Sequence, residues 1–277
     1  MNKKTFESQN ISIAIPTYNS SKYLEQLLSS SLKNEIVTEV VISDDASNVQ
    51  EKEIYLKTVE KFQKKYPDKK IKFVNNLERR GPFVNKYIAI ENCSKEIVYQ
   101  IDSDNIPMRN LDKFIKYDLL KLFNEDSLYL PSKIYQFYQK PYLSIPLSKV
   151  HNGTKYRVIF QDKNFRFDKD LIKKSILNEV KITKQKNSRW LINIGNFIVY
   201  KPNFLSTMKE GLSFSERLLF AADQFLISYL WLKNNNYIET RRQHYHFHRK
   251  RRDSISFQEK DNTEESFKTI EEKILEL

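Results

Sequence analysis

The stretch that decides the fold is ISIAIPTYNSSKYLEQLLSSSL, residues Ile11 to Leu32. Its first five residues, Ile11 to Ile15, are mostly apolar and predict a buried strand. The polar loop PTYNSS follows, and Lys22 to Leu32 then carries apolar side chains at helical spacing. A strand, a polar loop and an amphipathic helix, in this order, predict the first unit of a βα alternation.

The same alternation continues through the first hundred residues. Each further expected strand ends in polar residues, and the loops after the four strands read PTYNSS, DDASN, NNLERRGP and DSDNIP. The further expected strands are Val40 to Ser43, Ile71 to Val74 and Ile97 to Ile101, and the further expected helices are Ile54 to Phe62 and Val84 to Cys93. This pattern predicts a parallel sheet whose four loops converge at the carboxyl ends of the strands.

Composition narrows the class of protein. The chain has 277 residues, 40% of them hydrophobic, and a net charge of +12. Its single cysteine, Cys93, predicts a reducing cytoplasm, and we expect no secretory signal and no membrane span, because no apolar run approaches about 18 residues. The positive charge attracts polyphosphates and anionic lipids alike, so it does not select a partner.

Two carboxylates follow the fourth expected strand in VYQIDSDNIP. Asp102 and Asp104 are two positions apart, and side chains at this spacing share a face of an extended chain. Hard oxygen ligands of this kind suit Mg²⁺ or Mn²⁺ bound together with substrate phosphates. The alternative is an ordinary acidic surface loop.

Asp44 and Asp45 end the second expected strand in VVISDDAS. A carboxylate in this place accepts a hydrogen bond from the imide NH of a uracil, or it caps the following helix. Taken singly, the two interpretations are equally supported.

The second half is harder to interpret. We expect a helix from Leu111 to Phe123, no periodic structure from Tyr129 to Phe167, and a buried strand within Trp190 to Tyr200. Ser215 to Lys233 has the length and spacing of a helix. The last twenty residues predict a solvated helix or a frayed tail.

Four stretches, in this order and at these distances, resemble the nucleotide-binding half of family 2 glycosyltransferases: ISIAIPTYNSSKYLEQLLSSSL, VVISDDAS, GPFVNKYIAIENC and EIVYQIDSDN. The resemblance implies the α/β GT-A fold, which is Rossmann-like, with a mostly parallel central sheet flanked by helices and a mixed acceptor-side region. It implies one domain over residues 1–277, with a nucleotide-sugar half at 1–106, an acceptor half at 107–257 and a tail at 258–277.

The resemblance also implies site residues. Asp102 and Asp104 would contact the ribose and the metal, with Asp104 the more direct ligand, and Lys86 would lie near the base. The sequence has DDAS where the family commonly has DDGS, a change that Ala46 tolerates unless this residue needs a positive φ. The implied nucleotide contacts are Pro16, Thr17, Tyr18, Asn19, Asp44, Asp45, Arg80, Lys86, Asp102 and Ser103.

The motif FAADQFL resembles the acidic motif of the family, with Ala222 in place of its glutamate and Asp223 as its remaining carboxylate. In inverting members this aspartate is the general base that takes the proton of the acceptor hydroxyl. The alternative is a structural or solvated aspartate at a helix start. A carboxylate inside the apolar stretch LLFAADQFLISYLWL has to be explained by one of the two.

The segment HYHFHRKRRDSISF resembles the part of the family that closes over the diphosphate. The resemblance implies that His248, or else His246, completes the metal shell, and that Arg249, Arg251 and Arg252 neutralise the phosphates. We expect mutual repulsion to keep this segment mobile until ligand and metal bind.

The sequence therefore predicts a metal-dependent, inverting glycosyltransferase that uses a UDP-sugar and a glycan or lipid-linked acceptor, with Mn²⁺ or Mg²⁺ as cofactor. We expect a cytoplasmic protein that does not bind nucleic acid and associates peripherally with the inner face of the cell membrane. One rival is a sugar-1-phosphate nucleotidyltransferase, but PTYNSS lacks the expected glycines. The other is a nucleic-acid-binding module built on Arg241 to Arg252, which leaves both aspartate motifs unexplained.

Overall fold

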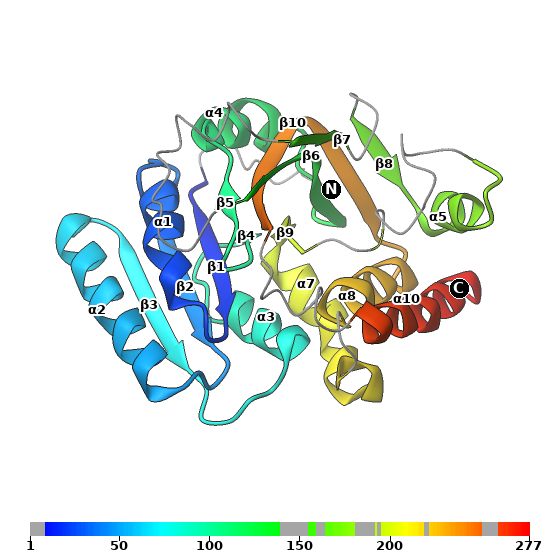
Figure 1. Cartoon of the computed structure of the whole chain (residues 1–277). Helices are drawn as coiled ribbons and strands as arrows, with labels where there is room; N and C mark the ends of the chain where they lie inside the picture. The colour runs from blue at the N-terminus through cyan, green and yellow to red at the C-terminus, as the bar shows by residue number, and fades with distance from the viewer. Residues whose placement is uncertain are drawn as a thin grey trace.

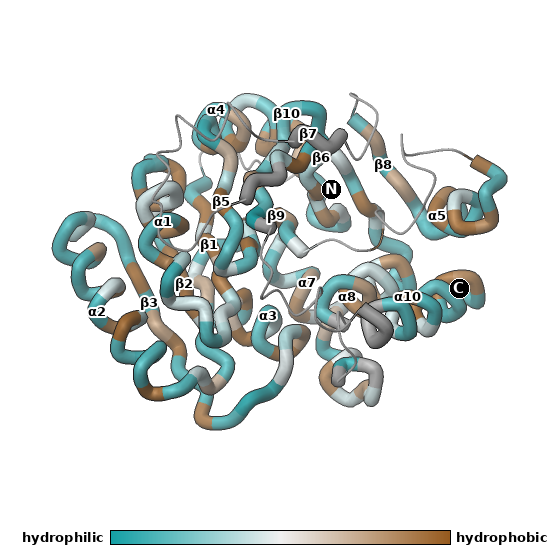
Figure 2. The backbone as a smooth tube through the Cα atoms, in the orientation of Figure 1, coloured by the Kyte–Doolittle hydropathy of each residue, from teal (hydrophilic) through white to brown (hydrophobic). Residues whose placement is uncertain are grey.

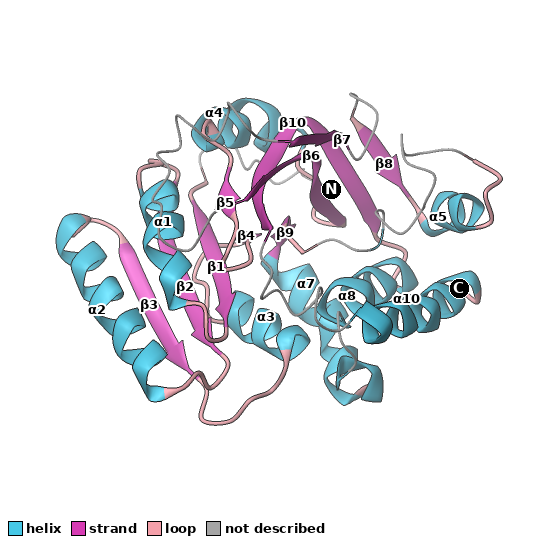
Figure 3. Ribbon diagram, viewed as in Figure 1, coloured by secondary structure: helices cyan, strands magenta, loops and turns pink. Residues whose placement is uncertain are grey.

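The computed structural model describes residues 9–138, 155–158, 164–180, 192, 195–218, 222–250 and 260–277. Its first half is the expected βα alternation, with four parallel strands in the order β3-β2-β1-β4 (Figures 1 and 3). The elements are β1 (Ile11–Thr17), α1 (Ser21–Leu32), β2 (Val37–Asp44), α2 (Val49–Lys65), β3 (Lys70–Asn75), α3 (Pro82–Glu91) and β4 (Ile97–Gln100). Every strand and helix expected in this half is confirmed.

The second half extends the same sheet rather than building a separate one. Next to β4 the order continues β9-β6-β10-β5, and β7 and β8 pair with β6 and β10. β9 is antiparallel to β4 and to β6, so this half is mixed, as expected. Its elements are β5 (Ile106–Pro107), α4 (Leu111–Phe114), β6 (Ser127–Tyr138), β7 (Lys155–Val158), β8 (Phe165–Phe167), α5 (Lys169–Ile176), β9 (Phe197–Tyr200), α7 (Lys201–Met208), α8 (Ala222–Lys233), β10 (Tyr237–Lys250) and α10 (Lys260–Leu275).

Several expectations for the second half are corrected. The described residues within Tyr129 to Phe167 are not irregular, because they contain most of the twelve-residue strand β6. The first six residues of β6, 127–132, are all buried, so the strand lacks the alternation of buried and exposed residues by which a half-exposed strand is recognised. Of the strand expected within Trp190 to Tyr200, the described part is β9 alone.

The expected helices also change character along their length. Leu111 to Phe123 is helical to Leu122, but α4 passes into a π-helical turn and then a 3₁₀ turn. Ser215 to Lys233 begins as a 3₁₀ turn, and α8 starts at Ala222. The C-terminal segment is a helix, but it is not a frayed tail, because α10 buries Phe267, Ile270 and Ile274 against the core.

Two apolar clusters fill the two sides of the sheet. Alternate residues of β1 go to opposite clusters: Ile13 and Ile15 pack with Leu28 of α1, whereas Ala14 packs on the side of Phe83 and Phe225. Apolar segments run through the central strands and the inner faces of the helices in Figure 2. The sheet is therefore covered on both faces, as parallel sheets require.

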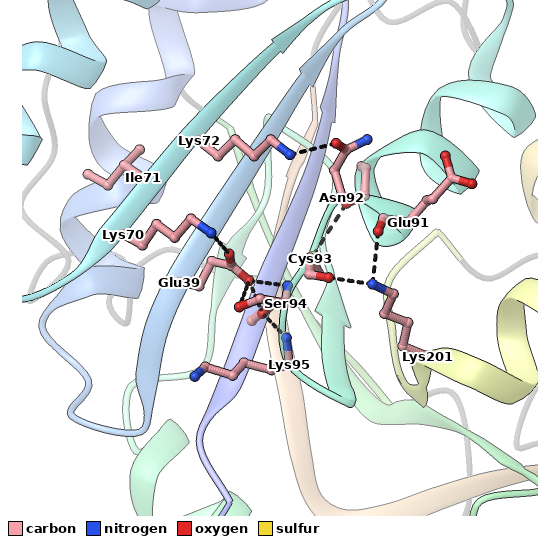
Figure 4. A network of polar contacts seen from close by, with 12 residues as sticks. Glu39, Lys70, Ile71, Lys72, Glu91, Asn92, Cys93, Ser94, Lys95 and Lys201 are labelled. Carbon is pink, nitrogen blue, oxygen red and sulfur yellow. Dashed lines mark hydrogen bonds and ion pairs between the residues drawn. The ribbon is translucent and has the colours of Figure 1, made fainter.

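A polar network fixes the amino ends of the strands (Figure 4). The carboxylate of Glu39 on β2 is buried; its Oε2 accepts hydrogen bonds from Ser12 Oγ at 2.5 Å and Ser94 N at 2.6 Å, and its Oε1 forms an ion pair with Lys70 Nζ at 3.2 Å. Burial alone raises the pKa of Glu39, but the bonds from Ser12 and Ser94 outweigh it, and the net pKa is lowered. This network leaves the opposite ends of the strands for the loops that carry the aspartate motifs.

Candidate active site

The loops at the carboxyl ends of β1, β2 and β3 are joined to one another by backbone hydrogen bonds. Asp45 N donates to Thr17 O at 2.9 Å, and Asn76 N donates to Asp44 O at 3.0 Å. Pro16 is tolerated in β1 because the pairing of β1 with β4 ends at Ala14, so no partner on that side needs its missing N–H. The predicted convergence of these loops is confirmed.

Hydroxyl groups join the first loop to the aspartate turn after β4. Tyr55 OH lies 2.7 Å from Thr17 Oγ1 and accepts a bond from Ser20 N at 2.7 Å. Ser20 Oγ lies 2.7 Å from Ser103 Oγ. Tyr55 is absent from the predicted site; its one signal in the sequence is a tyrosine on the buried face of an amphipathic helix.

Both aspartates of the second loop have partners inside the loops. Asp44 is fully buried and accepts bonds from the backbone N–H, at 3.1 Å, and the hydroxyl of Ser47. Burial raises the pKa of Asp44 despite these bonds. Asp45 accepts bonds from Arg80 N at 2.7 Å and Gly81 N at 3.0 Å. Neither caps α2, because Asn48 is the capping residue.

Ala46 has a φ of 59°, in the left-handed region. This is the condition under which replacing the family glycine carries a cost, because the Cβ of an L-residue crowds the following carbonyl there. Ala46 is therefore a strained position of the loop. Asn19, on the facing loop, is also left-handed, with a φ of 45°, and its backbone N–H donates to Ser47 Oγ at 2.8 Å.

Aromatic and charged side chains line the exposed rim of these loops. The guanidinium of Arg79 lies 4.3 Å from the ring centre of Tyr18. Arg80 pairs with Glu78 at 3.0 Å and is half-exposed. Tyr18, Asn19 and Arg80 are thus accessible at the edge where a nucleotide was expected.

The aspartate motif after β4 forms a turn. Asn105 N donates to Asp102 O at 3.0 Å, so residues 102–105 are not extended, and the argument that Asp102 and Asp104 share a strand face does not apply. Asp102 is directed to Lys86 instead, with Oδ1 3.1 Å from its ammonium.

Lys86 joins the two expected halves of the site. It is buried on α3, and its ammonium lies 3.1 Å from Asp102 Oδ1, 2.7 Å from Asp223 Oδ2 and 3.0 Å from Gly195 O. Burial alone lowers the pKa of Lys86, but the charges of the two carboxylates outweigh it and raise the net pKa. Lys86 is therefore engaged with two carboxylates rather than open to a nucleobase, where it was expected.

Asp102 is also held by a hydrogen bond to its backbone N–H. Asp102 N donates to Asn196 Oδ1 at 2.7 Å, and Asn196 Nδ2 lies 3.1 Å from His246 Nε2. Because Oδ1 accepts, Nδ2 donates, so His246 Nε2 is an acceptor. Burial first, and the neighbouring His248 second, hold the pKa of His246 well below its usual value.

His246 and Arg249 are thus engaged inside the protein. Arg249 Nε donates to Asp104 O at 3.1 Å, its NH2 donates to Gln26 Oε1 at 2.5 Å, and its guanidinium lies over the ring of Tyr23. Arg249 therefore holds the aspartate turn against α1, and a phosphate would have to displace these contacts. Of the expected ligands on β10, the half-buried His248 is the more accessible.

The expected mobile closing segment is partly a strand. Residues 237–250 form β10, which pairs with β6 over most of its length and with β5 at His246 and Phe247. Backbone pairing on two sides opposes the charge repulsion from which mobility was expected. Arg251 and Arg252 lie outside the described residues.

The described side chains suit only one kind of metal site. Nowhere among them do three His, Cys, Asp or Glu residues gather as a metal cluster. Mg²⁺ and Mn²⁺ also bind through one or two carboxylates plus substrate phosphates. Asp102 and Asp104 supply carboxylates on one turn, and both are half-buried rather than enclosed. The residues fit an ion held largely by a bound diphosphate.

Two further residues were missed by the sequence interpretation. Asn196 supports Asp102, and Gly195 lies so near that a Cβ there would be 2.5 Å from Asp102 Oδ2. The chain has four glycines, and this one shortly precedes a buried strand. That placement was the available signal for a close approach to the site.

The chain is similar in sequence to known proteins. A family model described as glycosyl transferase family 2 matches residues 12–206. The poly(ribitol-phosphate) β-N-acetylglucosaminyltransferase TarS of Staphylococcus aureus strain Mu50 is 36% identical over 99 residues, which are 34% of this chain and 16% of TarS. The matched stretch is thus about a sixth of that relative.

Solved structures show the same fold. The crystal structure of S. aureus TarS 1–349 in complex with UDP-GlcNAc has a TM-score of 0.61 at 21% identity, over 96% of this chain and 67% of that one. The structure of GalNAc-T7 with UDP, GalNAc and Mn²⁺ has a TM-score of 0.56 at 15% identity, over 88% and 44%. Within the described residues, no helix has both the length and the apolar character to cross a bilayer. The family match covers more than half of the chain, which therefore belongs to glycosyl transferase family 2 and has the GT-A fold.

Proposed function

We propose that this enzyme transfers a sugar from a UDP-sugar to a glycan or lipid-linked acceptor, with inversion at the anomeric carbon. The observation that carries the proposal is the buried Lys86, whose ammonium contacts both Asp102 and Asp223. It links the residue expected at the donor to the residue expected at the acceptor. An acidic surface loop and an unrelated helix cap have no reason to share one buried counter-ion.

The donor nucleotide is assigned to the rim formed by the first three loops. Tyr18 and Arg79 present an aromatic ring and a guanidinium stacked at 4.3 Å, which suits a flat base. Asp44 is buried and bonded to Ser47, so we assign it the role of shaping the loop that meets the base. The TarS structure that shares this fold was solved with UDP-GlcNAc, which supports a uridine donor.

The diphosphate is assigned to the turn at Asp104. A divalent metal bound there would act as a Lewis acid and stabilise the leaving diphosphate. Asp104 and the accessible His248 are the residues proposed to hold it. Arg249 bonds to the backbone of Asp104, so it positions the turn rather than the phosphates. The presence of UDP and Mn²⁺ in the GalNAc-T7 structure supports a metal of this class.

Asp223 is proposed as the general base. It lies in the first turn of α8 and is 7% exposed, and its Oδ2 is held by Lys86 at 2.7 Å. The proposal assigns Oδ1 to accept the proton of the acceptor hydroxyl as that oxygen attacks the anomeric carbon. Lys86 then keeps the carboxylate in position during the transfer.

The test compares two variants on one preparation each. Asp223→Asn is expected to lower kcat by about 10²- to 10⁴-fold, the usual range for general-base catalysis, with donor affinity near wild type. Asp104→Asn is expected to abolish the dependence of UDP-sugar binding on Mn²⁺ in calorimetry. Wild-type turnover in folded Asp223→Asn protein would remove Asp223 from the mechanism. Retention of the anomeric configuration in the product would exclude inversion.

A further inference from the structure

A pocket of about 300 Å³ lies outside the proposed donor site, between α4, β6 and β10. It has the size of the smaller ligand sites of proteins. Its described lining holds three cationic side chains and no carboxylate. The lining residues are Met108, Asn110, Lys113, Phe114, Lys133, Tyr135, Arg242, Gln243 and Tyr245.

A wide bulge in β10 shapes one wall of this pocket. Arg241 pairs with Pro131 and Tyr245 pairs with Lys133, so three residues of β10 lie opposite the single residue Ser132. The hydroxyl of the buried Ser132 lies 3.1 Å from Arg242 O and 3.2 Å from His244 O. Its single proton donates to one of these two carbonyl groups at a time, at the place where the bulge interrupts the pairing of β10 with β6.

The bulge directs neighbouring side chains to opposite sides. His244 is fully buried and stacks on Phe114 with ring centres 4.9 Å apart. Arg242 and Gln243 are exposed and line the pocket. Bulges commonly redirect side chains next to functional sites. The buried histidine anchors the bulge, and the arginine faces the ligand space.

The pocket combines charge with aromatic surface. Lys113 on α4, Lys133 on β6 and Arg242 on β10 come from three separate elements. Tyr135 and Tyr245 meet edge to face with ring centres 5.2 Å apart. Cations recognise an anionic group, and aromatic rings pack against the C–H face of a sugar or polyol.

The position of the pocket links it to the aspartate turn. The lining residue Met108 lies four positions after Asp104, and a chain of four residues spans at most about 14 Å. β5 within this stretch is paired with β10, so the connection is fixed in the sheet. A saccharide of a few units is long enough to reach from one place to the other.

We propose that this pocket binds one phosphate- or carboxylate-bearing unit of the saccharide acceptor, at a distance from the unit that receives the sugar. A single pocket of about 300 Å³ favours one sugar-sized anion over nucleic acid, which needs a continuous basic track along its backbone. The inference rests on the proposed function only because it takes the ligand to be part of the acceptor. Binding of the anion can be measured without any transfer of a sugar.

In the experiment, the full chain is titrated with ribitol 5-phosphate, gluconate and neutral ribitol. Binding of each ligand is measured by saturation-transfer NMR. The wild type is expected to bind at least one of the two anions at least about tenfold more tightly than ribitol, and the comparison of the two identifies the anionic group. Lys113→Gln/Arg242→Gln is expected to lose about tenfold in affinity for that anion. The control Lys57→Gln/Lys209→Gln removes the same charge from exposed sites elsewhere and is expected to match the wild type.

Three results would overturn the inference. The first is that the wild type binds ribitol and both anions equally, and the second is that the pocket variant binds the anions as tightly as the wild type. The third is a pocket variant that loses binding to oligouridine or phosphatidylglycerol vesicles but still binds the small anions. UDP-sugar binding is measured on the same preparations and is expected to be unchanged in the pocket variant. Failure of the wild type to bind any UDP-sugar contradicts the proposed function and leaves the pocket result to be judged separately.

Discussion

At the scale of single residues, the site depends on side chains that satisfy two partners at once. Lys86 forms ion pairs with two carboxylates, and Asn196 accepts a hydrogen bond from the backbone of Asp102 while donating one to His246. A buried charge that loses its partner costs about 3–5 kcal/mol, so Lys86 cannot be exchanged without destabilising the fold. Precision at Asp102 therefore comes from residues beside it, Lys86 and Asn196.

Ala46 offers a test at the same scale, because its left-handed φ of 59° costs an alanine about 1–2 kcal/mol. Ala46→Gly removes this cost, but glycine raises the conformational entropy of the unfolded chain, which lowers the free energy of unfolding by about 0.4–1 kcal/mol. We expect a net gain of roughly 0.5–1 kcal/mol in the free energy of unfolding, measured by urea denaturation. Ala46→Val is the control and is expected to destabilise. The same sign for both variants would mean that residue 46 does not keep this conformation.

At the scale of elements, helix α3 carries Lys86 and is fixed at its carboxyl end by another lysine. Lys201 Nζ donates to Glu91 O, the last carbonyl group of the helix, at 2.8 Å, and also to Cys93 O just beyond the helix end (Figure 4). A cation in this place also complements the helix dipole. The contact joins α3 to α7, which begins at Lys201.

Lys201→Met is expected to lower the free energy of unfolding by about 1–2 kcal/mol, because it removes a charged donor from carbonyl groups at the end of a helix. Thermal denaturation should show a loss of a few degrees. Lys209→Met, at an exposed position just after the same helix α7, is the control and should stay within about 0.5 kcal/mol of wild type. Equal effects of the two changes would mean that the cap adds no stability.

The elements also show what the sequence could predict. β1 to β4 and their helices were predictable, because each strand is a short apolar run followed by a polar loop. β6 was not predictable, because its first six residues are buried without alternation. It also pairs with β10, where Ser127 lies opposite Tyr237, far along the chain. No local pattern carries a pairing of that range.

In the candidate site, too, local features could be read from the sequence and long-range contacts could not. The motifs at Asp44, Asp102 and Asp223 could be singled out as candidates from the sequence, because each stands at the end of an apolar run or interrupts one. Their partners were not: the ion pair of Lys86 with Asp223 and the bond of Asn196 to Asp102 join residues that are distant in the chain. Such contacts depend on the packing of α3, α8 and β9 and leave no periodic trace in the sequence.

At the scale of the whole molecule, one sheet joins the half that carries Asp102 to the half that carries Asp223. β9 is the junction, since it pairs with β4 on one side and with β6 on the other. His244 lies near this junction, with its ring stacked on Phe114 and edge-on to Tyr99. A charge on this histidine would therefore act on the packing between the two halves.

The last prediction concerns the pH dependence of global stability. Complete burial lowers the pKa of His244 from 6.5 to about 3. His244 is therefore protonated below about pH 6.5 in the unfolded chain but only below about pH 3 in the folded protein. The free energy of unfolding consequently falls as the pH falls from 6.5 to about 3. The slope approaches about 1.4 kcal/mol per pH unit, which gives roughly 1.5–2 kcal/mol between about pH 6.5 and 5. His246, whose pKa is also lowered, adds to the fall in the same direction.

His244→Phe keeps an aromatic ring against Phe114 and removes the titrating group. Urea denaturation at about pH 7.5, 6.5, 5.5 and 5.0 is expected to show a shallower loss of stability in this variant, by roughly 1.5–2 kcal/mol between about pH 6.5 and 5. The comparison uses the slope rather than the absolute stability, so a packing defect that is independent of pH does not affect it. Parallel curves for the variant and the wild type would show that His244 is protonated in the folded protein as readily as in the unfolded chain.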